Sequence, residues 1–296
     1  MKRSEPLPLL AGRLRVRSVA GAADDPLPYS VMGAPDGRAD RSRIYYEAGP
    51  SGLAIVATEL FQTAGPGFIE HAKKALAAPG TEVVRVRVDD PSLRVIASLP
   101  TEVPDGSSGT AFMLVGYVVQ TDGTVQRLQI GTFPGEFTSV PGCRALALRL
   151  ARSLTAGPRQ LETKAGRREL TLVGRRFALT VPDRWVLTVQ RGPDFDVARV
   201  RQLAEFPTPA PLVGLALTHH PDRSAGGPTT QRPAQVLGTA TQWKLSTGQT
   251  DDGNKVLSAA LDVPVDGMTL DVWAVSPSDE IRKRSMAIVE SLARIE

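Results

Sequence analysis

The side chains that could perform acid–base or metal chemistry are few in this sequence. Three histidines occur in 296 residues, and two of them, His219 and His220, are adjacent and precede Asp222. Imidazole and carboxylate groups bind zinc, so this segment would suit a metal-dependent hydrolase. Adjacent residues of a strand point to opposite faces, however, so the two histidines cannot bind one ion together. We therefore interpret them as strand-end histidines in a loop and expect no metal site.

The other residues of chemical interest have structural explanations. His71 lies beside acidic and basic neighbours on a predicted helix, which is typical of an exposed helical face. The single cysteine excludes an internal disulfide, and Cys143 has the helical spacing of a small buried residue. Three acidic pairs precede or lie within predicted turns, and turn formation explains them. These pairs are Asp24-Asp25, Asp89-Asp90 and Asp251-Asp252.

Motifs for nucleotides and for nucleophilic catalysis are missing from the sequence. It contains no Gly-Lys-Ser/Thr phosphate loop, no Gly-x-Gly-x-x-Gly and no Gly-x-Ser-x-Gly. The sequence therefore predicts no catalytic residue and no cofactor. Scattered residues could still form an active site that sequence spacing does not reveal.

A basic segment lies near the middle of the chain. A contact with nucleic acid or acidic lipid is one interpretation, but no aromatic residues are interleaved for base stacking. We favour a solvated linker and expect no nucleic acid partner. The basic residues are Arg152, Arg159, Lys164, Arg167, Arg168, Arg175 and Arg176.

The composition is typical of a globular protein. Hydrophobic residues make up 42% of the chain, charged residues 22%, and the net charge is +4. No stretch approaches the roughly 18 consecutive apolar residues of a membrane-spanning helix. Residues 6–12 end in Leu-Leu-Ala-Gly, as a lipoprotein signal does, but Arg13 replaces the cysteine and the apolar run is short. The expected location is cytoplasmic as written, or periplasmic if a signal was removed.

Two segments of the chain share one predicted order of elements, a hairpin followed by a helix. Residues 256–275 predict a hairpin around Asp266-Gly267, which suits a type I′ turn, and an amphipathic helix follows Pro277. Residues 112–154 repeat this order around Asp122-Gly123. The chain is therefore expected to be α+β, with two tandem modules that each pack an antiparallel sheet against helices. The expected boundaries are 10–155 for the first module, 156–168 for the linker and 169–296 for the second module.

Further strands and one helix are predicted around these hairpins. A helix is expected over 66–78, between Pro66 and Pro79-Gly80. Residues 82–88 alternate between apolar and polar side chains, as a strand with one wet face does. Residues 195–206 suit a helix or a strand, and residues 219–232 predict the longest loop.

The second module resembles a known family. Residues 177–185 form an amphipathic strand that ends in Pro182 and Trp185, similar to the entry motif of the PsbP-like superfamily. This superfamily includes the extrinsic photosystem II protein, Ran-release-factor relatives and bacterial envelope or secretion-associated domains. The closing hairpin and the helix ending near Glu290-Ser291-Leu292 also resemble it. The first module keeps the strand alternation at residues 14–19 but lacks the Pro and the Trp.

The resemblance implies an antiparallel sheet packed against helices, and most members are adaptors or binding proteins. We therefore expect a non-catalytic binding or adaptor protein with a protein partner. The alternatives are a chaperone or accessory factor of a bacterial secretion system, which rests on the resemblance alone, and the metal-dependent hydrolase of His219, His220 and Asp222. The sequence does not determine the oligomeric state.

Overall fold

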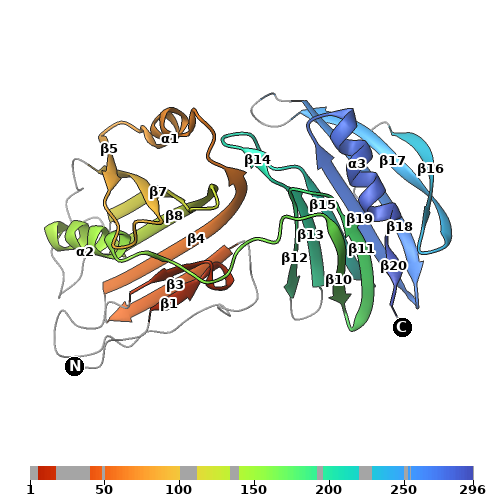
Figure 1. Cartoon of the computed structure of the whole chain (residues 1–296), viewed down its shortest axis with the longest axis horizontal. Coiled ribbons are helices and arrows are strands. Elements are labelled where there is room, and N and C mark those ends of the chain that lie inside the picture. The colour runs from red at the N-terminus through yellow and green to blue at the C-terminus, as the bar shows by residue number, and fades with distance from the viewer. Residues whose placement is uncertain are drawn as a thin grey trace. The chain divides into compact units, whose positions relative to one another are not determined.

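The computed structural model describes residues 6–17, 41–48, 51–100, 112–133, 140–191, 196–219, 229–249, 253 and 255–295 (Figure 1). Within these residues the fold is β-rich, with 57% strand and 16% helix. Four sheets hold the strands, and the α-helices have only 9, 13 and 12 residues. The expected α+β class is therefore wrong, because strands predominate and the helices are few and short.

Two segments for which the sequence predicts an ambiguous element or a loop form paired strands. Residues 195–206 suited a helix or a strand, and Asp196–Gln202 forms strand β13, hydrogen-bonded on both sides. The end of the predicted loop 219–232 belongs to strand β16, Thr230–Val236. Each segment pairs with strands that adjoin it in the sequence, and this pairing outweighs a weak local pattern.

The chain forms two compact units. The first comprises Met1–Gln160 and Glu205–Pro209, and the second comprises Leu161–Ala204 and Ala210–Glu296. The sequence divided the chain once, at the linker, so the short segment Glu205–Pro209 was not expected in the first unit.

The first unit contains a small sheet and a large sheet, and the long strands of the large sheet pair in antiparallel order. The small sheet has the order β1-β2-β9 and contains β1 (Leu7–Leu9), β2 (Leu14–Val16) and β9 (Thr155–Ala156), with the 3-10 helix η1 (Leu10–Gly12) between β1 and β2. The large sheet has the order β14-β4-β8-β7-β6-β5, with β3 also paired to β4. Its strands are β3 (Arg41–Ala48), β4 (Ser51–Thr63), β5 (Thr81–Val86), β6 (Arg94–Pro100), β7 (Phe112–Val119), β8 (Thr124–Phe133) and β14 (Ala204–Glu205).

The second unit has the same two kinds of sheet. The small sheet has the order β10-β11-β20 and contains β10 (Gly166–Leu172), β11 (Arg175–Val181) and β20 (Ala293–Arg294). The large sheet has the order β12-β13-β15-β19-β18-β17-β16. Its strands, besides β13 and β16, are β12 (Trp185–Arg191), β15 (Leu212–Thr218), β17 (Thr239–Gln249), β18 (Lys255–Val265) and β19 (Met268–Ser276).

One strand topology therefore occurs twice in the chain. The order β4-β8-β7-β6-β5 in the first unit matches β15-β19-β18-β17-β16 in the second. A helix follows the last long strand in both units, α2 (Val140–Arg152) and α3 (Asp279–Glu290). A short strand then returns to the small sheet in both, as β9 and β20. The two Asp-Gly turns consequently lie in equivalent hairpins, β7–β8 and β18–β19.

The two turns differ in length. Asp266 and Gly267 have φ values of 48° and 77° and connect the paired residues Val265 and Met268, which confirms the type I′ prediction. In the first unit, Gly123 also has a positive φ, of 79°, but the loop is longer. Its Asp122 accepts a hydrogen bond from the Thr124 amide at 2.9 Å, as an Asx turn does.

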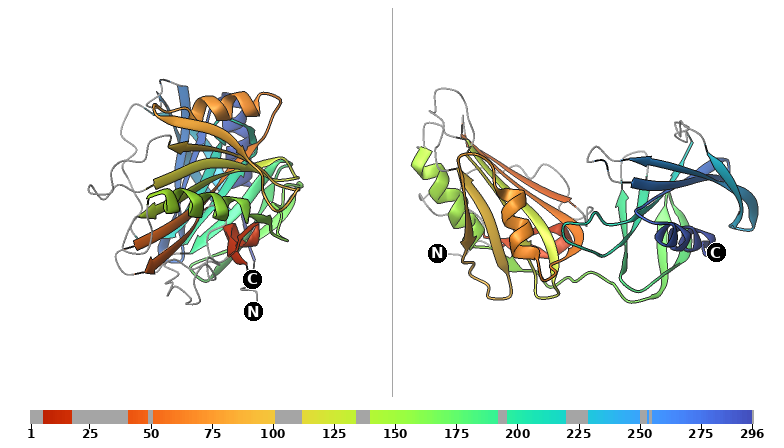
Figure 2. Two further views of the ribbon diagram at one scale, coloured as in Figure 1. Left: turned by 90° about the vertical axis from the view of Figure 1, so that its left-hand side faces the viewer. Right: turned by 90° about the horizontal axis from the view of Figure 1, so that it is seen from above.

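Apolar side chains fill both faces of the first unit's large sheet. Helix α2 packs on one face, in a core that includes Leu114, Ile130 and the buried Cys143. Helix α1 (Phe68–Leu76) packs on the other face, where Phe68 contacts Tyr117. Figure 2 shows the two helices on opposite sides of this sheet. Among the described residues, no helix has the length and apolarity to cross a bilayer.

One core holds the second unit together. Met286 and Val289 of α3 lie in it with Trp185 and Trp243, each at most 2% exposed. The Trp243 indole donates a hydrogen bond to Glu290 Oε1 at 2.9 Å, so the ring anchors β17 to the end of the helix.

Candidate functional site

The predicted metal-binding segment is only partly described. His219 is exposed just after β15, while His220 and Asp222 lie outside the described residues. His71 is exposed on α1. Over the described ranges, no group of three or more His, Cys, Asp or Glu side chains could hold a metal ion.

Of the three acidic pairs, the structure describes only Asp89-Asp90. Asp90 Oδ1 accepts a hydrogen bond from the Ser92 amide at 2.8 Å, and Oδ2 accepts one from the Ala156 amide at 2.8 Å. Hydrogen bonding by Ser92 and by the Ala156 amide lowers the pKa of Asp90, and Ser92 has the larger effect. Asp89 pairs with Arg17 at 3.3 Å. Both carboxylates therefore serve turn and sheet contacts. Asp24-Asp25 and Asp251-Asp252 lie outside the described residues.

Three residues of the basic segment form ion pairs within the second unit. Arg168 pairs with Glu162 at 3.0 Å, and Arg176 pairs with Glu169 at 3.1 Å. Arg175 contacts the turn residue Asp266 at 3.1 Å. These carboxylates reduce the positive potential that a polyanion would require.

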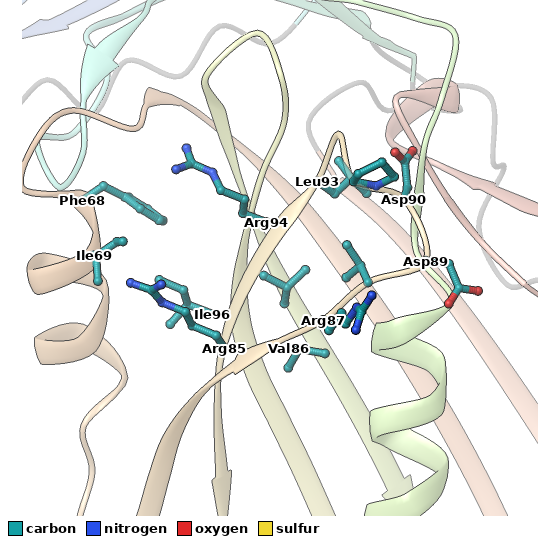
Figure 3. A pocket seen from close by; sticks show the side chains of 13 residues that line it. Phe68, Ile69, Arg85, Val86, Arg87, Asp89, Asp90, Leu93, Arg94 and Ile96 are labelled. Carbon is teal, nitrogen blue, oxygen red and sulfur yellow. The ribbon is translucent and has the colours of Figure 1, made fainter.

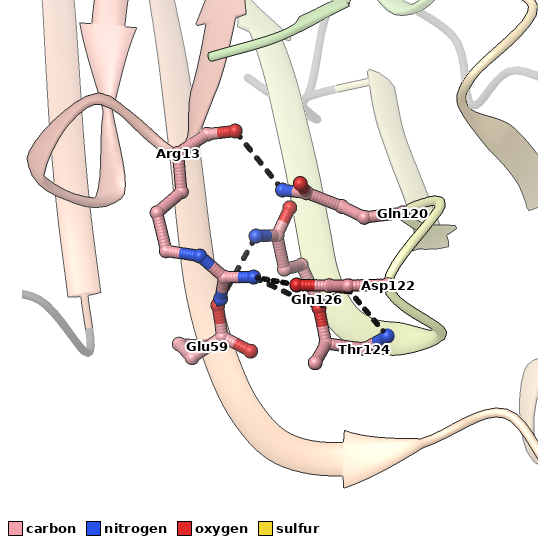
Figure 4. A network of polar contacts seen from close by, with 6 residues as sticks. All are labelled: Arg13, Glu59, Gln120, Asp122, Thr124 and Gln126. Atoms are coloured by element: carbon pink, nitrogen blue, oxygen red, sulfur yellow. Dashed lines mark hydrogen bonds and ion pairs between the residues drawn. The ribbon is translucent and has the colours of Figure 1, made fainter. Parts of the chain in front are cut away.

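A buried polar network lies in the first unit (Figure 4). Arg13 is 3% exposed and forms an ion pair with Glu59, whose side chain has no exposed surface. The same guanidinium contacts Asp122 Oδ2 at 3.1 Å and Thr124 Oγ1 at 2.9 Å. Gln126 donates a hydrogen bond to Glu59 Oε2 at 3.1 Å. The network therefore joins the start of β2 to β4 and to the β7–β8 hairpin.

The network lies beside an irregularity in the backbone of β4. The register of β4 against β8 shifts between Glu59 and Gln62, and Phe61 between them has φ of 55°. Burial raises the pKa of Glu59, while the Arg13 charge and the Gln126 hydrogen bond lower it in part. Because neither charged side chain reaches solvent, the pair cannot meet a substrate. We interpret the network as a structural clamp between the two sheets.

The second unit repeats one contact of this clamp. Arg175 begins β11 and pairs with Asp266, as Arg13 precedes β2 and pairs with Asp122. Arg294 also pairs with Asp266, and its hydrogen bond is the main cause of the lowered pKa of that carboxyl. In both units the Asp of the Asp-Gly turn thus holds the small sheet to the long hairpin.

A hollow of 540 Å³ opens at the β5–β6 hairpin of the first unit (Figure 3). We call it the basic hollow, because three of its lining residues are arginines. Phe68 and Ile69 of α1 contribute apolar side chains, and residues 85–91 and 93–96 supply the rest.

The arginines of the basic hollow are Arg85, Arg87 and Arg94, and all three are exposed. None forms an ion pair with any residue that the structure describes. Arg85 lies opposite Ile96, two residues after Arg94 on β6, so both arginines lie on the α1 face of the sheet. Figure 3 shows their side chains on the side of Phe68 and Ile69.

This arrangement suits binding of carboxylates. Guanidinium groups form charge-assisted hydrogen bonds with carboxylates, and the nearby apolar surface accommodates side chains between them. The hollow contains no histidine or cysteine, and its acids, Asp89 and Asp90, already have partners.

Comparisons of the chain with protein-family models, with curated proteins and with solved structures gave no match.

Proposed function

We propose that the chain is a non-catalytic binding protein, built from two PsbP-like modules, that engages an acidic region of a protein partner through the basic hollow. One observation carries the proposal: three arginines without an ion-pair partner among the described residues surround a partly apolar depression. Unpaired like charges repel one another, and an acidic partner would replace that repulsion by attraction.

The repeated topology supports the modular part of the proposal. Both units contain the same strand order, and in the second unit Trp185 is buried after the Pro182 turn, where the PsbP-like entry motif places it. The predicted compartment, cytoplasm or periplasm, stays a prediction.

A titration with a labelled acidic peptide tests the proposal. The probe is a fluorescein-labelled peptide of alternating glutamate and valine, and its anisotropy is followed as full-length protein is added. Arg85→Glu/Arg94→Glu should weaken binding by about tenfold or more, because each charge-assisted hydrogen bond contributes about 1.5–3 kcal/mol. Added salt should weaken the binding of the unaltered protein as well.

Arg232→Glu is the matched control. Arg232 is also exposed and unpaired within the described residues, and it lies on β16, the strand of the second unit equivalent to β5. This variant should bind as the unaltered protein does. Equal losses for both variants, or equal binding of a peptide with lysine in place of glutamate, would refute the proposal.

A further inference from the structure

Strand β5 is an open edge of the large sheet in the first unit. It pairs with β6 on one side and ends the strand order β14-β4-β8-β7-β6-β5. No backbone hydrogen bond reaches the outer side of its residues 82–86 from the part of the chain that the structure describes. Such an edge presents unpaired amide and carbonyl groups that can pair with another strand.

The equivalent edge of the second unit is protected in a way that β5 is not. Strand β16 is outermost there and carries Pro233 near its middle. Proline has no amide hydrogen and discourages strand addition, so it is common on exposed edges. Strand β5, Thr81–Val86, contains no proline. The duplicated topology thus has one blocked edge and one edge available for pairing.

The side chains of β5 indicate which strand would fit. Arg85 lies on the α1 face beside the basic hollow. On the opposite face, Val84 and Val86 pack with the α2 core, and Glu82 pairs with Arg144 at 3.6 Å. A strand added to this edge would place alternate side chains beside the arginine and beside the valines, because successive residues point to opposite faces.

We infer that β5 binds an extended segment of the partner by strand addition, with acidic side chains on the α1 face and apolar side chains on the α2 face. This inference rests on the proposed function and specifies its binding mode. The six residues of β5 set the length of the paired segment, about 20 Å at roughly 3.3 Å per residue. Main-chain hydrogen bonds would supply affinity, and the arginines would select acidic sequences.

A second copy of this chain is a poorer occupant of the edge. Pairing of two β5 strands about Arg85 places two arginines directly opposite each other, which is destabilising. An acidic segment instead matches the positive charge of Arg85, Arg87 and Arg94.

Peptide N-methylation tests the inference without altering the protein. Two versions of the glutamate–valine peptide carry N-methyl groups on alternate residues, so each version blocks one of its two edges. Strand addition uses only one edge, so one version should bind about tenfold or more weakly, while the other should bind like the unmodified peptide. Analytical ultracentrifugation of the protein without peptide should show no association through β5.

The outcomes separate this inference from the proposed function. If the peptide binds in an Arg85-dependent manner but tolerates N-methylation on both edges, strand addition is wrong and the acidic binding site stands. If the unmodified peptide does not bind at all, both fail. A dimer of the free chain that the acidic peptide dissociates assigns the edge to a second copy and also overturns the inference.

Discussion

Replacing Arg13 by methionine should destabilise the first unit strongly at neutral pH. Methionine keeps much of the side-chain length but removes the charge and every hydrogen bond of the guanidinium. Glu59 would then keep only the hydrogen bond from Gln126, in a site where its side chain has no exposed surface. Asp122 and Thr124 would lose their contacts with the guanidinium as well.

The expected cost follows from this loss. Removing one partner of a buried ion pair typically costs about 3–5 kcal/mol, because the remaining charge stays buried without compensation. With a urea dependence of about 2 kcal/mol per molar, the unfolding midpoint of the first unit should fall by about 2 M. The double variant Arg13→Met/Glu59→Gln should lose less than the sum of the single changes, since it leaves no uncompensated carboxylate.

The sequence supplies a separate probe for each unit. Cys143 is the single cysteine and is 1% exposed in the first unit, so thiol labelling reports unfolding there. The three tryptophans, Trp185, Trp243 and Trp273, all belong to the second unit, so their fluorescence reports unfolding of that unit. Arg13→Met should shift the labelling midpoint much more than the fluorescence midpoint.

Arg175→Met is the control for this experiment. Arg175 and Asp266 are 38% and 41% exposed, so solvent screens their ion pair and the fluorescence midpoint should change little. A labelling midpoint for Arg13→Met within experimental error of the unaltered protein would refute the role of the buried clamp. Equal shifts of both probes would refute the assignment of the clamp to the first unit alone.

Two further predictions concern Glu59 and the second hairpin. Because burial raises the pKa of Glu59, its contribution to stability is present at acidic pH and is lost as pH rises through the raised value. Glu59→Gln should therefore gain stability relative to the unaltered protein as pH rises from acidic to neutral, measured by dithiodipyridine labelling of Cys143; a constant difference would contradict this. Gly267→Ala places a Cβ at φ of 77° and should cost about 1 kcal/mol in the tryptophan transition. No change there would contradict the type I′ turn.

Local features of the fold were predictable from the sequence. The Asp266-Gly267 turn depends on two residues that tolerate positive φ, and the buried position of Cys143 follows from helical spacing. The balance of strand and helix was not predictable in the same way, because β13 and β16 owe their structure to partners outside their own segments.

Only part of the candidate site could be predicted from the sequence. Alternation over residues 82–88 indicated a strand with one wet face, and Arg85 lies on that face. The hollow also needs Phe68 and Ile69 from α1 and Arg94 from the next strand, whose positions depend on the tertiary fold. The Arg13–Glu59 pair spans 46 positions, so no spacing rule could reveal it. The ring centroids of Phe206 and Phe68 are 5.2 Å apart, although the sequence assigns Phe206 to the second module.

Amide hydrogen exchange with the acidic peptide bound tests the central claim most directly. The full-length protein is exchanged with and without saturating glutamate–valine peptide, and the rates are compared for β5 (Thr81–Val86) and β16 (Thr230–Val236). Binding at the basic hollow by pairing with β5 predicts slower exchange in β5 and unchanged exchange in β16. Unchanged exchange in β5, or equal protection of both strands, would contradict the account.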